Sequence, residues 1–266
     1  MGNNQVIMVT GCSTGMGRDI CEIMTNKGYI VVATARNIDS LKNVPASLKL
    51  RLDVTDKEMI NSAVNSVVQK FGKIDILINN AGYSTRGAME EVEIDKVRKM
   101  FDTNVFGIIN MIQAVLPEMR KVNYGKIINV GSISGKFTQS LNGGYCASKH
   151  AVEAISDALR LEMKKYNIQS TVIELGPIET NFFSTLSNTS DNLMKNTHSP
   201  YYDIYKKDID YRKIQKRTDS KKAASRICNI LIKDKLKPRY KVAVPFSFKL
   251  LIKLPDSIKE FILLRH

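Results

Sequence analysis

The chain has 266 residues, 43% of them hydrophobic and 25% charged, which is typical of a folded globular protein and excludes a disordered tail or a collagen. A membrane bundle is also excluded, because charged residues interrupt the longest apolar runs. The formal net charge of +14 raises nucleic acid, an anionic membrane or a phosphorylated ligand as partners.

The chain has four cysteines, Cys12, Cys21, Cys146 and Cys228, which are too few for a framework of disulfide bonds in a chain of this length. None of their spacings is that of a zinc site, so we expect no metal. The first residues enter an apolar strand at once and show no secretory signal. These features predict a cytoplasmic protein with reduced thiols.

Short β-branched runs alternate with helical periodicity along the chain, which indicates βαβ units around a parallel sheet. The expected strands are residues 6–9, 29–34, 48–52, 74–78, 126–130, 170–174 and 240–244. The expected helices are residues 18–27, 60–71, 92–121, 144–166 and 220–233. We therefore predict an α/β fold, a single doubly wound Rossmann domain over residues 1–266 with a seven-stranded parallel sheet and helices on both faces.

Two segments depart from this rhythm. Residues 181–219 have no clear period and predict a substrate lid, the alternative being a surface loop without a role. Residues 240–264 predict a final strand followed by an apolar helix that packs on the core or on a neighbouring subunit. Peripheral membrane contact is the alternative there, because lysines are interspersed among the apolar residues.

A glycine-rich turn follows the first strand and precedes the first helix. Glycines at such a place let the backbone approach a pyrophosphate and direct a helix N-terminus at its charge, although tight turns also use glycine without binding anything. The candidate nucleotide-binding residues here are Gly11, Ser13, Thr14, Gly15, Met16 and Gly17.

The second strand ends at Ala35-Arg36, where an acidic residue would be expected to hold the ribose hydroxyls of NAD. Ala35 leaves room, and Arg36 can form charge-assisted hydrogen bonds with a 2′-phosphate. This predicts NADP in preference to NAD, the alternative being a solvated arginine. Asp53-Val54 and Asn79-Asn80-Ala81-Gly82 end later strands and lie on the same edge of the sheet.

Tyr145 and Lys149 are four residues apart on a predicted helix and so share one face. A free tyrosine has a pKa of about 10, too high for easy proton exchange at pH 7, and a nearby ammonium group can lower it. A Tyr and Lys pair with this spacing also occurs by chance on many helices.

The ordered set of Thr10-Gly11, Gly15, Gly17, Asn79 to Gly82, Asn104, Ser132, Tyr145 and Lys149 resembles the short-chain dehydrogenase/reductase family over nearly the whole chain. The resemblance implies that Tyr145 is the general acid or base, that Ser132 orients the substrate oxygen, and that Lys149 lowers the tyrosine pKa and holds the nicotinamide ribose. It implies that Asn104 anchors a water of a proton relay, the alternative being a polar residue that satisfies backbone inside a helix.

The same resemblance implies the remaining cofactor contacts. Asp53 and Val54 would flank the adenine, and Asn80, Ala81 and Gly82 would line the adenosine side. Pro177, Ile178 and Thr180 would lie at the nicotinamide end. The chain departs from the family pattern at Leu175, where a proline is usual, and at Met16, which replaces an isoleucine of similar volume.

These expectations describe an NADP(H)-dependent oxidoreductase that transfers a hydride between the nicotinamide and the carbonyl or alcohol of a hydrophobic small molecule. The alternative is a catalytically idle NADP-binding sensor. A faint likeness to hydroxysteroid and retinol dehydrogenases points to lipid-like substrates, and the family resemblance implies a homodimer or homotetramer. No nucleic-acid-reading motif accompanies the charge, which is concentrated in residues 201–241 with 14 Lys and Arg against 5 Asp. Solvated helix and loop faces explain that cluster best.

Overall fold

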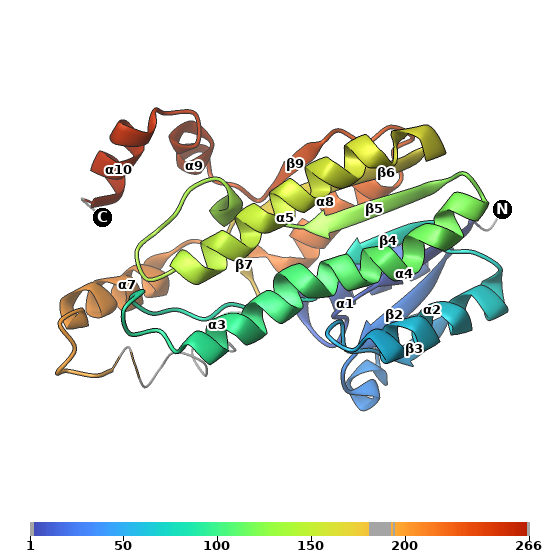
Figure 1. Cartoon of the computed structure of the whole chain (residues 1–266), viewed down its shortest axis with the longest axis horizontal. Helices are drawn as coiled ribbons and strands as arrows, with labels where there is room; N and C mark the ends of the chain where they lie inside the picture. The colour runs from blue at the N-terminus through green and yellow to red at the C-terminus, as the bar shows by residue number, and fades with distance from the viewer. Residues whose placement is uncertain (1–2, 181–192, 194, 265–266) are drawn as a thin grey trace.

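The computed structural model describes residues 3–180, 193 and 195–264. Its centre is a seven-stranded parallel sheet in the order β3-β2-β1-β4-β5-β6-β9 (Figure 1). The strands are β1 (Asn3–Val9), β2 (Tyr29–Ala35), β3 (Leu48–Arg51), β4 (Ile76–Asn79), β5 (Gly125–Val130), β6 (Ile168–Leu175) and β9 (Arg239–Val242). The predicted doubly wound α/β fold is confirmed, with each expected strand in place.

Helices cover both faces of this sheet. The α-helices are α1 (Gly15–Asn26), α2 (Lys57–Phe71), α3 (Ile94–Phe101), α4 (Gly107–Lys121), α5 (Gly143–Glu162), α7 (Tyr202–Ile214), α8 (Ser220–Leu231), α9 (Phe246–Leu251) and α10 (Asp256–Leu264). Short 3-10 turns are η1 (Ile38–Leu41), η3 (Ile133–Gly135) and η4 (Lys164–Tyr166), and η2 (Asp102–Phe106) is a π-helical stretch.

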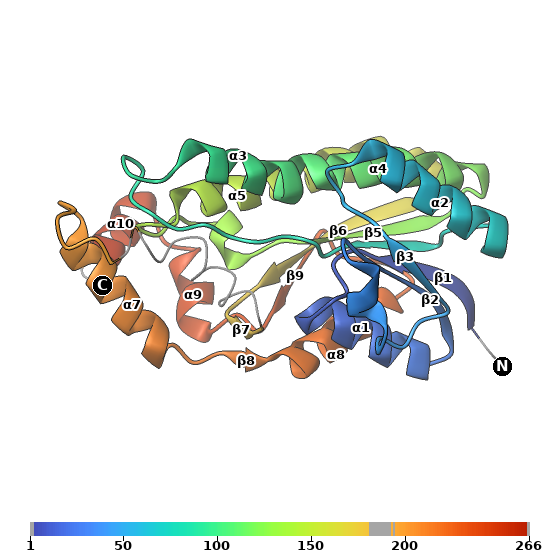
Figure 2. The ribbon, with the colours of Figure 1, turned by 90° about the horizontal axis from the view of Figure 1, so that it is seen from below.

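The alternation of side chains along β1 shows why both faces must be covered. Ile7 and Val9 belong to the core beneath α1 and α8, whereas Val6 and Met8 belong to the core beneath α2, α4 and α5. All four are fully buried. Figure 2 shows the sheet between these two helical layers. Because the part of β1 from Val6 to Val9 is buried on both faces, all its residues are apolar, and the sequence does not alternate between apolar and polar residues.

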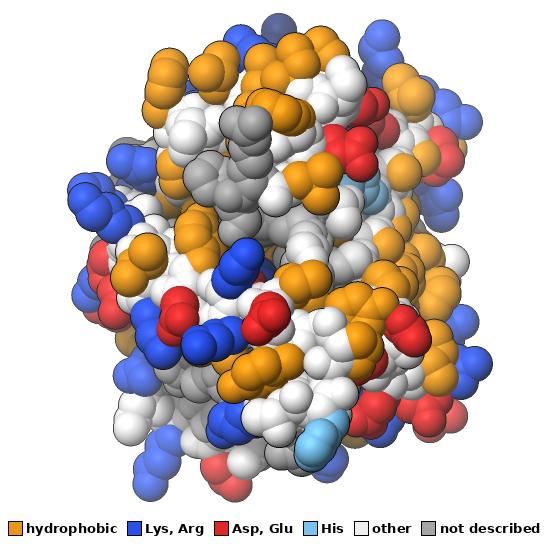
Figure 3. Space-filling view, turned by 90° about the vertical axis from the view of Figure 1, so that its left-hand side faces the viewer, with side chains coloured by type: hydrophobic (Ala, Val, Ile, Leu, Met, Phe, Trp, Pro, Cys, Tyr) orange, Lys and Arg blue, Asp and Glu red, His pale blue; other side chains and the backbone are white. Residues whose placement is uncertain are grey.

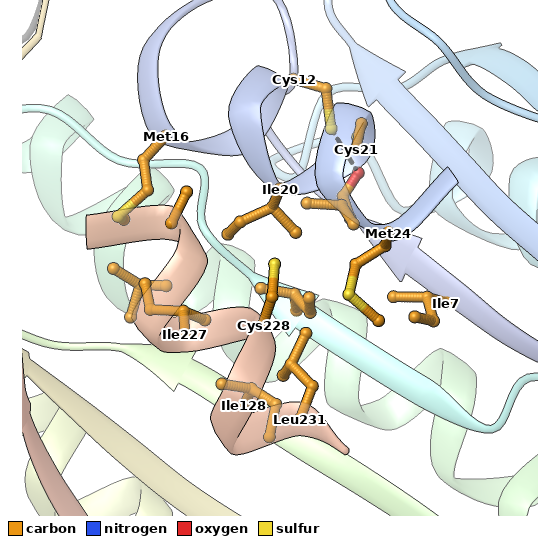
Figure 4. Close-up of a cluster of buried hydrophobic side chains, with 14 of the residues drawn as sticks. Ile7, Cys12, Met16, Ile20, Cys21, Met24, Ile128, Ile227, Cys228 and Leu231 are labelled. Carbon is orange, nitrogen blue, oxygen red and sulfur yellow. Dashed lines mark hydrogen bonds between the residues drawn. The ribbon is translucent and has the colours of Figure 1, made fainter. Parts of the chain in front are cut away.

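The first core is closed by the packing of α1 on α8, two helices about 200 residues apart in sequence (Figure 4). Ile20 and Met24 of α1 lie against Ile227 and Leu231 of α8, and all are fully buried. The four cysteines are buried and free. They therefore serve as small apolar side chains in the structure.

The predicted continuous helix over residues 92–121 is interrupted by η2. Asn104 lies in this stretch and is fully buried. Its side-chain Nδ2 donates to the Tyr83 carbonyl at 2.8 Å and its Oδ1 accepts from the Tyr83 N–H at 3.0 Å. Since π-helical bulges inside α-helices are frequent at functional sites, the interruption marks Asn104 as a special position.

The predicted lid is helical in part. Residues 181–192 and 194 lie outside the described residues, but residues 202–214 form α7, a helix that the sequence pattern did not predict. The periodicity missed α7 because Tyr205 is its one buried residue. The buried Tyr205 hydroxyl donates to Glu91 at 2.7 Å and accepts from the Ala88 N–H at 2.9 Å.

The C-terminal region also differs from its prediction. Instead of one helix after β9, two short helices, α9 and α10, are separated by a turn that contains Pro255, a residue that cannot continue a helix. Within the described ranges, no helix combines the length and the apolar character needed to cross a bilayer.

Candidate active site

A cleft of about 770 Å³ runs along the carboxyl edge of the sheet. Because β1 and β4 are neighbours while their connections leave in opposite directions, this edge contains the switch point where open α/β sheets bind ligands. The cleft walls include these predicted residues: Gly11, Ser13, Thr14, Gly15, Met16, Gly17, Arg36, Asp53, Val54, Asn80, Ala81, Gly82, Ser132, Tyr145, Lys149, Pro177, Ile178 and Thr180. Asn104 does not line it and lies buried behind Gly82.

The glycine-rich turn forms one end of the cleft. The helix α1 begins at Gly15, and its N-cap Thr14 makes no side-chain cap hydrogen bond. Its first N–H groups therefore remain available to an anion. Gly11 and Gly15 have φ of +71° and +55°, a region that disfavours other residues.

Asn80 ties this turn to the end of β4. Its Nδ2 donates to the carbonyls of Thr10 at 2.9 Å and Gly11 at 3.0 Å. The Thr10 Oγ1 accepts from the N–H groups of Asn80 and Ala81, both at 3.0 Å. A Cβ added to Gly17 would lie 2.4 Å from the Gly11 carbonyl oxygen and 2.6 Å from the Asn80 Nδ2. The turn is thus built around the absence of a side chain at Gly17.

The adenosine end is lined by residues after β2 and β3. Ala35 is buried, whereas Arg36 is exposed with its backbone carbonyl accepting from Arg51 Nε at 3.3 Å. The Asp53 carboxylate accepts from the N–H of Thr55 at 2.9 Å and from its hydroxyl at 2.8 Å. The Arg36 side chain lies at the cleft wall directly after β2, at the place where an acidic residue would hold an unphosphorylated ribose.

Ser132 and Tyr145 lie together at the opposite end of the cleft. Ser132 follows β5, and its Oγ accepts from the Ser134 N–H at 3.1 Å, which caps η3. Tyr145 lies in the first turn of α5. Its surroundings raise its pKa to about 12, mainly through burial, while a hydrogen bond with the Ser132 side chain acts in the opposite direction. The phenol therefore stays protonated at neutral pH.

Lys149 is placed one helical turn after Tyr145. It is buried, its Nζ donates to the Val130 carbonyl at 2.8 Å, and it lies 5.8 Å from the centre of the Tyr145 ring. Burial lowers the Lys149 pKa to about 8. We expected Lys149 to lower the tyrosine pKa, but in the protein alone that pKa is raised. The reason is that burial of the phenol raises its pKa by more than the neighbouring groups lower it.

Asn104 approaches Lys149 from the other side of Gly82. A Cβ added to Gly82 would lie 3.0 Å from the Asn104 Oδ1 and 4.0 Å from the Lys149 Nζ. The Asn104 Nδ2 also lies 3.3 Å from the Ser148 Oγ. Both alternatives raised by the sequence are compatible with this geometry, because Asn104 satisfies the Tyr83 backbone and, like Lys149, lies beside Gly82.

The stretch after β6 forms the remaining wall. Ile178–Glu179 is β7, which pairs with β8 (Thr218–Asp219) in a two-stranded parallel ladder. A Cβ added to Gly15 would lie 3.2 Å from Thr180, so this stretch crosses the cleft opposite the glycine turn. The sequence did not reveal the ladder, because two residues per strand carry no periodic signal.

The structure also shows cleft contacts that sequence reasoning did not reveal. Arg86 lines the cleft and forms an ion pair with Asp208 of α7, which in turn pairs with Arg212 at 2.9 Å. Phe248 of α9 lines it as well and stacks on Phe137 with ring centroids 5.5 Å apart. The partners of Arg86 and Phe248 are more than 100 residues away in sequence, so only the tertiary structure could reveal these contacts.

Comparisons with known proteins agree with this architecture. Residues 5–191 match the short chain dehydrogenase family. The 3-ketodihydrosphingosine reductase of Bacteroides thetaiotaomicron is 33% identical over 265 residues, which cover 97% of this chain and 96% of that protein.

Solved structures give the same result. A short-chain dehydrogenase from Streptomyces avermitilis superposes with a TM-score of 0.80 and 27% identity, covering 98% of this chain and 93% of that one. The closed form of a serine dehydrogenase complexed with NADP+ gives a TM-score of 0.78 at 25% identity, covering 89% of this chain and 94% of that one.

The fold and the cleft define an oxidoreductase that binds a nicotinamide cofactor and acts on a small molecule. The chain belongs to the short-chain dehydrogenase family.

Proposed function

We propose that this protein is an NADP(H)-dependent reductase of carbonyl groups on hydrophobic small molecules, with Tyr145 as the general acid. The observation that carries the proposal is the joint placement of Ser132, Tyr145 and Lys149 in one cleft with the glycine turn and Arg36. The residues present fit the cofactor. The absence of a side chain at Gly17 lets the turn pack tightly against α1, and the first N–H groups of α1 are available to the phosphates.

Each residue has a distinct task in this proposal. NADPH, when bound, supplies the hydride. Ser132 donates a hydrogen bond to the substrate carbonyl oxygen, and Tyr145 gives it a proton as negative charge develops there. In the reductive direction Tyr145 needs a proton to give, and its phenol holds that proton at pH 7. Lys149 holds the nicotinamide ribose and contributes a positive charge below pH 8.

The cleft wall supports a hydrophobic substrate. Ile133, Phe137 and Phe248 supply apolar contact beside Ser132, and they belong to one apolar cluster. The relative from Bacteroides thetaiotaomicron is named for reducing a keto compound, which supports including ketones of lipid type in the search. A panel of steroids, retinoids, fatty aldehydes and keto lipids, followed by NADPH absorbance, tests the proposal. NADPH binding without turnover of any of them would favour the idle sensor instead.

The Arg36→Gln variant tests the choice of cofactor. Since a charge-assisted hydrogen bond contributes about 1.5–3 kcal/mol, we expect kcat/KM with NADPH to fall about 10- to 100-fold. The value with NADH should change by less than about threefold, because NADH lacks the 2′-phosphate, and it serves as the control within the same variant. A wild-type enzyme that strongly prefers NADH would contradict the role of Arg36.

Gly17→Ala tests the glycine turn. The added Cβ would overlap the Gly11 carbonyl and Asn80 Nδ2, so we expect a loss of about 2–3 kcal/mol in the free energy of unfolding and a rise of at least about tenfold in the Kd for NADPH. Gly28→Ala is the matched control just beyond the other end of α1. A Cβ there meets nothing within 4 Å, and the φ of +80° accounts for a stability loss of about 1 kcal/mol without a change in NADPH affinity. Equal NADPH affinity in both variants would contradict the proposal that the glycine turn binds the cofactor.

The homo-oligomeric state and the cytoplasmic location stay predictions. For the oligomer, exposed Phe106 at the start of α4 and exposed Leu161 near the end of α5 support the helices expected to form the interface. Sedimentation of the wild-type chain measures it directly.

A further inference from the structure

The two C-terminal helices, α9 and α10, have an inner face that packs on the rest of the protein. Leu251 of α9 is buried in an apolar cluster with Ile133 and Phe137, and Ile262 and Leu263 of α10 pack against the same cluster. This confirms that the segment docks on the core. Figures 1 and 2 place both helices at the end of the molecule opposite the N-terminus.

The outer face of the same helices is also apolar. Phe246 is 80% exposed and Leu250 is 54% exposed on α9, while Leu264 is 81% exposed on α10. Figure 3 shows apolar side chains gathered over the upper part of this end of the molecule, where α9 and α10 lie. Large exposed apolar side chains that cluster on one face mark an interaction surface.

Two lysines lie at α9, one on the helix and one in the turn that follows it. Phe246, Lys249 and Leu250 recur at the i, i+3 and i+4 positions and so share one side of α9, and Lys253 lies two residues beyond its end. Both lysines are exposed, and neither forms an ion pair with the residues that the structure describes. Apolar side chains flanked by unpaired lysines match the boundary between acyl chains and anionic headgroups.

A second copy of this chain suits the surface less well. A two-fold contact between identical surfaces would bring Lys249 and Lys253 of one copy close to those of the other. α9 has no acidic residue, and of the two acids of α10 Asp256 already pairs with Lys259, which leaves Glu260 against Lys249 and Lys253. The charge therefore favours an anionic bilayer as the occupant.

The surface is continuous with the active-site cleft. Phe248 lies between the exposed Phe246 and Leu250 in sequence, yet its ring lines the cleft and stacks on Phe137. A second groove of about 880 Å³ is bordered by Leu263 and Leu264 of α10 and shares Phe137 and Gln139 with the cleft. A protein held on a bilayer by α9 and α10 would open its cleft close to the lipid.

We propose that the outer face of α9 and α10 is a docking surface for an anionic phospholipid bilayer. Phe246, Leu250 and Leu264 enter the headgroup boundary, and Lys249 and Lys253 contact the acidic headgroups. Lys249 and Lys253 contribute to the net charge of +14, although most of the excess positive charge lies elsewhere in the chain.

Vesicle flotation tests the proposal without any enzyme assay, so its outcome is independent of the proposed reaction. We expect the wild-type chain to float with phosphatidylcholine vesicles that contain about 30% phosphatidylglycerol, and at least about tenfold less with pure phosphatidylcholine. Added salt should weaken the binding, because exposed charges are screened. Absence of flotation with the anionic vesicles would overturn the proposal.

Two double variants identify the surface. Phe246→Ser/Leu250→Ser and Lys249→Glu/Lys253→Glu should each lower the bound fraction at least about tenfold. Ile38→Ser/Ile232→Ser is the control for the first, because these side chains are 41% and 44% exposed on η1 and just after α8, outside α9 and α10. Lys235→Glu/Lys237→Glu is the control for the second, since both lysines precede β9 at its opposite end.

The outcome of these variants decides between the possible occupants. Circular dichroism and thermal melting establish that each variant is folded. Equal losses in the control variants would overturn the proposal. So would a wild-type dimer in sedimentation that the Phe246→Ser/Leu250→Ser variant converts to monomer, because the face would then be an interface between copies.

Discussion

Replacing Tyr145 by phenylalanine should lower kcat for carbonyl reduction about 1,000-fold and leave the Kd for NADPH within about threefold of wild type. The variant keeps the ring and loses only the hydroxyl, which is the group that shares a hydrogen bond with Ser132 and that burial keeps protonated. A proton donor removed from the transition state affects turnover and leaves ground-state binding of the cofactor largely intact. Single-turnover reduction, with NADPH binding measured separately by fluorescence, resolves the two quantities.

Tyr83→Phe is the matched control for this variant. Tyr83 lines the same cleft, burial also raises the pKa of its phenol, and its tie to Asn104 runs through backbone atoms that the substitution preserves. We expect kcat to change by less than about threefold, since no proton transfer is assigned to its hydroxyl. A similar loss in both variants would mean that the cleft needs phenols for its shape or polarity, and would contradict a specific acid at Tyr145.

The sequence was sufficient for the sheet because parallel strands are buried on both faces. The buried parts of β1 and β4, Val6 to Val9 and Ile76 to Ile78, are apolar and largely β-branched, which is the pattern expected of such strands. The glycine turn was visible for a related reason: Gly17 occupies a place where any side chain would overlap backbone, so the residue type itself reports the geometry. Helix periodicity placed Tyr145 and Lys149 on one face, and the family resemblance distinguished them from a chance pair.

The missed features all depend on contacts between distant segments. Asn104 in the π-helical stretch bonds the backbone of Tyr83, which lies 21 residues earlier in sequence, and local periodicity does not encode such a contact. Helix α7 is held by Tyr205 and by the Arg86–Asp208 ion pair, and its own sequence is mostly polar. Such contacts position the substrate side of the cleft, which explains why the cofactor side was easier to predict than the substrate side.

Lys149→Met should abolish most activity without lowering stability at pH 7. Its pKa falls from 10.5 to about 8 on burial, so keeping the amine charged in the folded protein at pH 7 costs about 3 kcal/mol. Methionine removes that cost but leaves the Val130 carbonyl without its donor, a loss of about 1–3 kcal/mol. We therefore expect a free energy of unfolding between unchanged and about 2 kcal/mol higher, together with a fall in kcat of at least about 100-fold.

The pH dependence of the free energy of unfolding should differ between the wild type and Lys149→Met in a defined direction. Between pH 8 and 10.5 the unfolded chain keeps a proton on Lys149 that the folded protein has lost, so this group makes wild-type stability rise with pH in that window. The variant lacks this rise. Urea unfolding of both proteins at pH 7 and pH 10 should therefore show the variant equal or more stable at the lower pH and less stable at the higher one.

Lys126→Met is the control that tests whether the loss of any buried lysine has the same effects on stability and activity as the loss of Lys149. Lys126 is also buried and burial lowers its pKa, but it lies at the start of β5, away from the cleft, and its Nζ donates to the carbonyls of Leu231 at 3.1 Å and Lys233 at 2.7 Å. Because two acceptors lose their donor there, we expect a stability loss of about 2 kcal/mol with nearly unchanged kcat. A structural lysine thus loses stability and keeps activity, whereas Lys149 should do the reverse. Unchanged turnover in Lys149→Met would contradict its place in the active site.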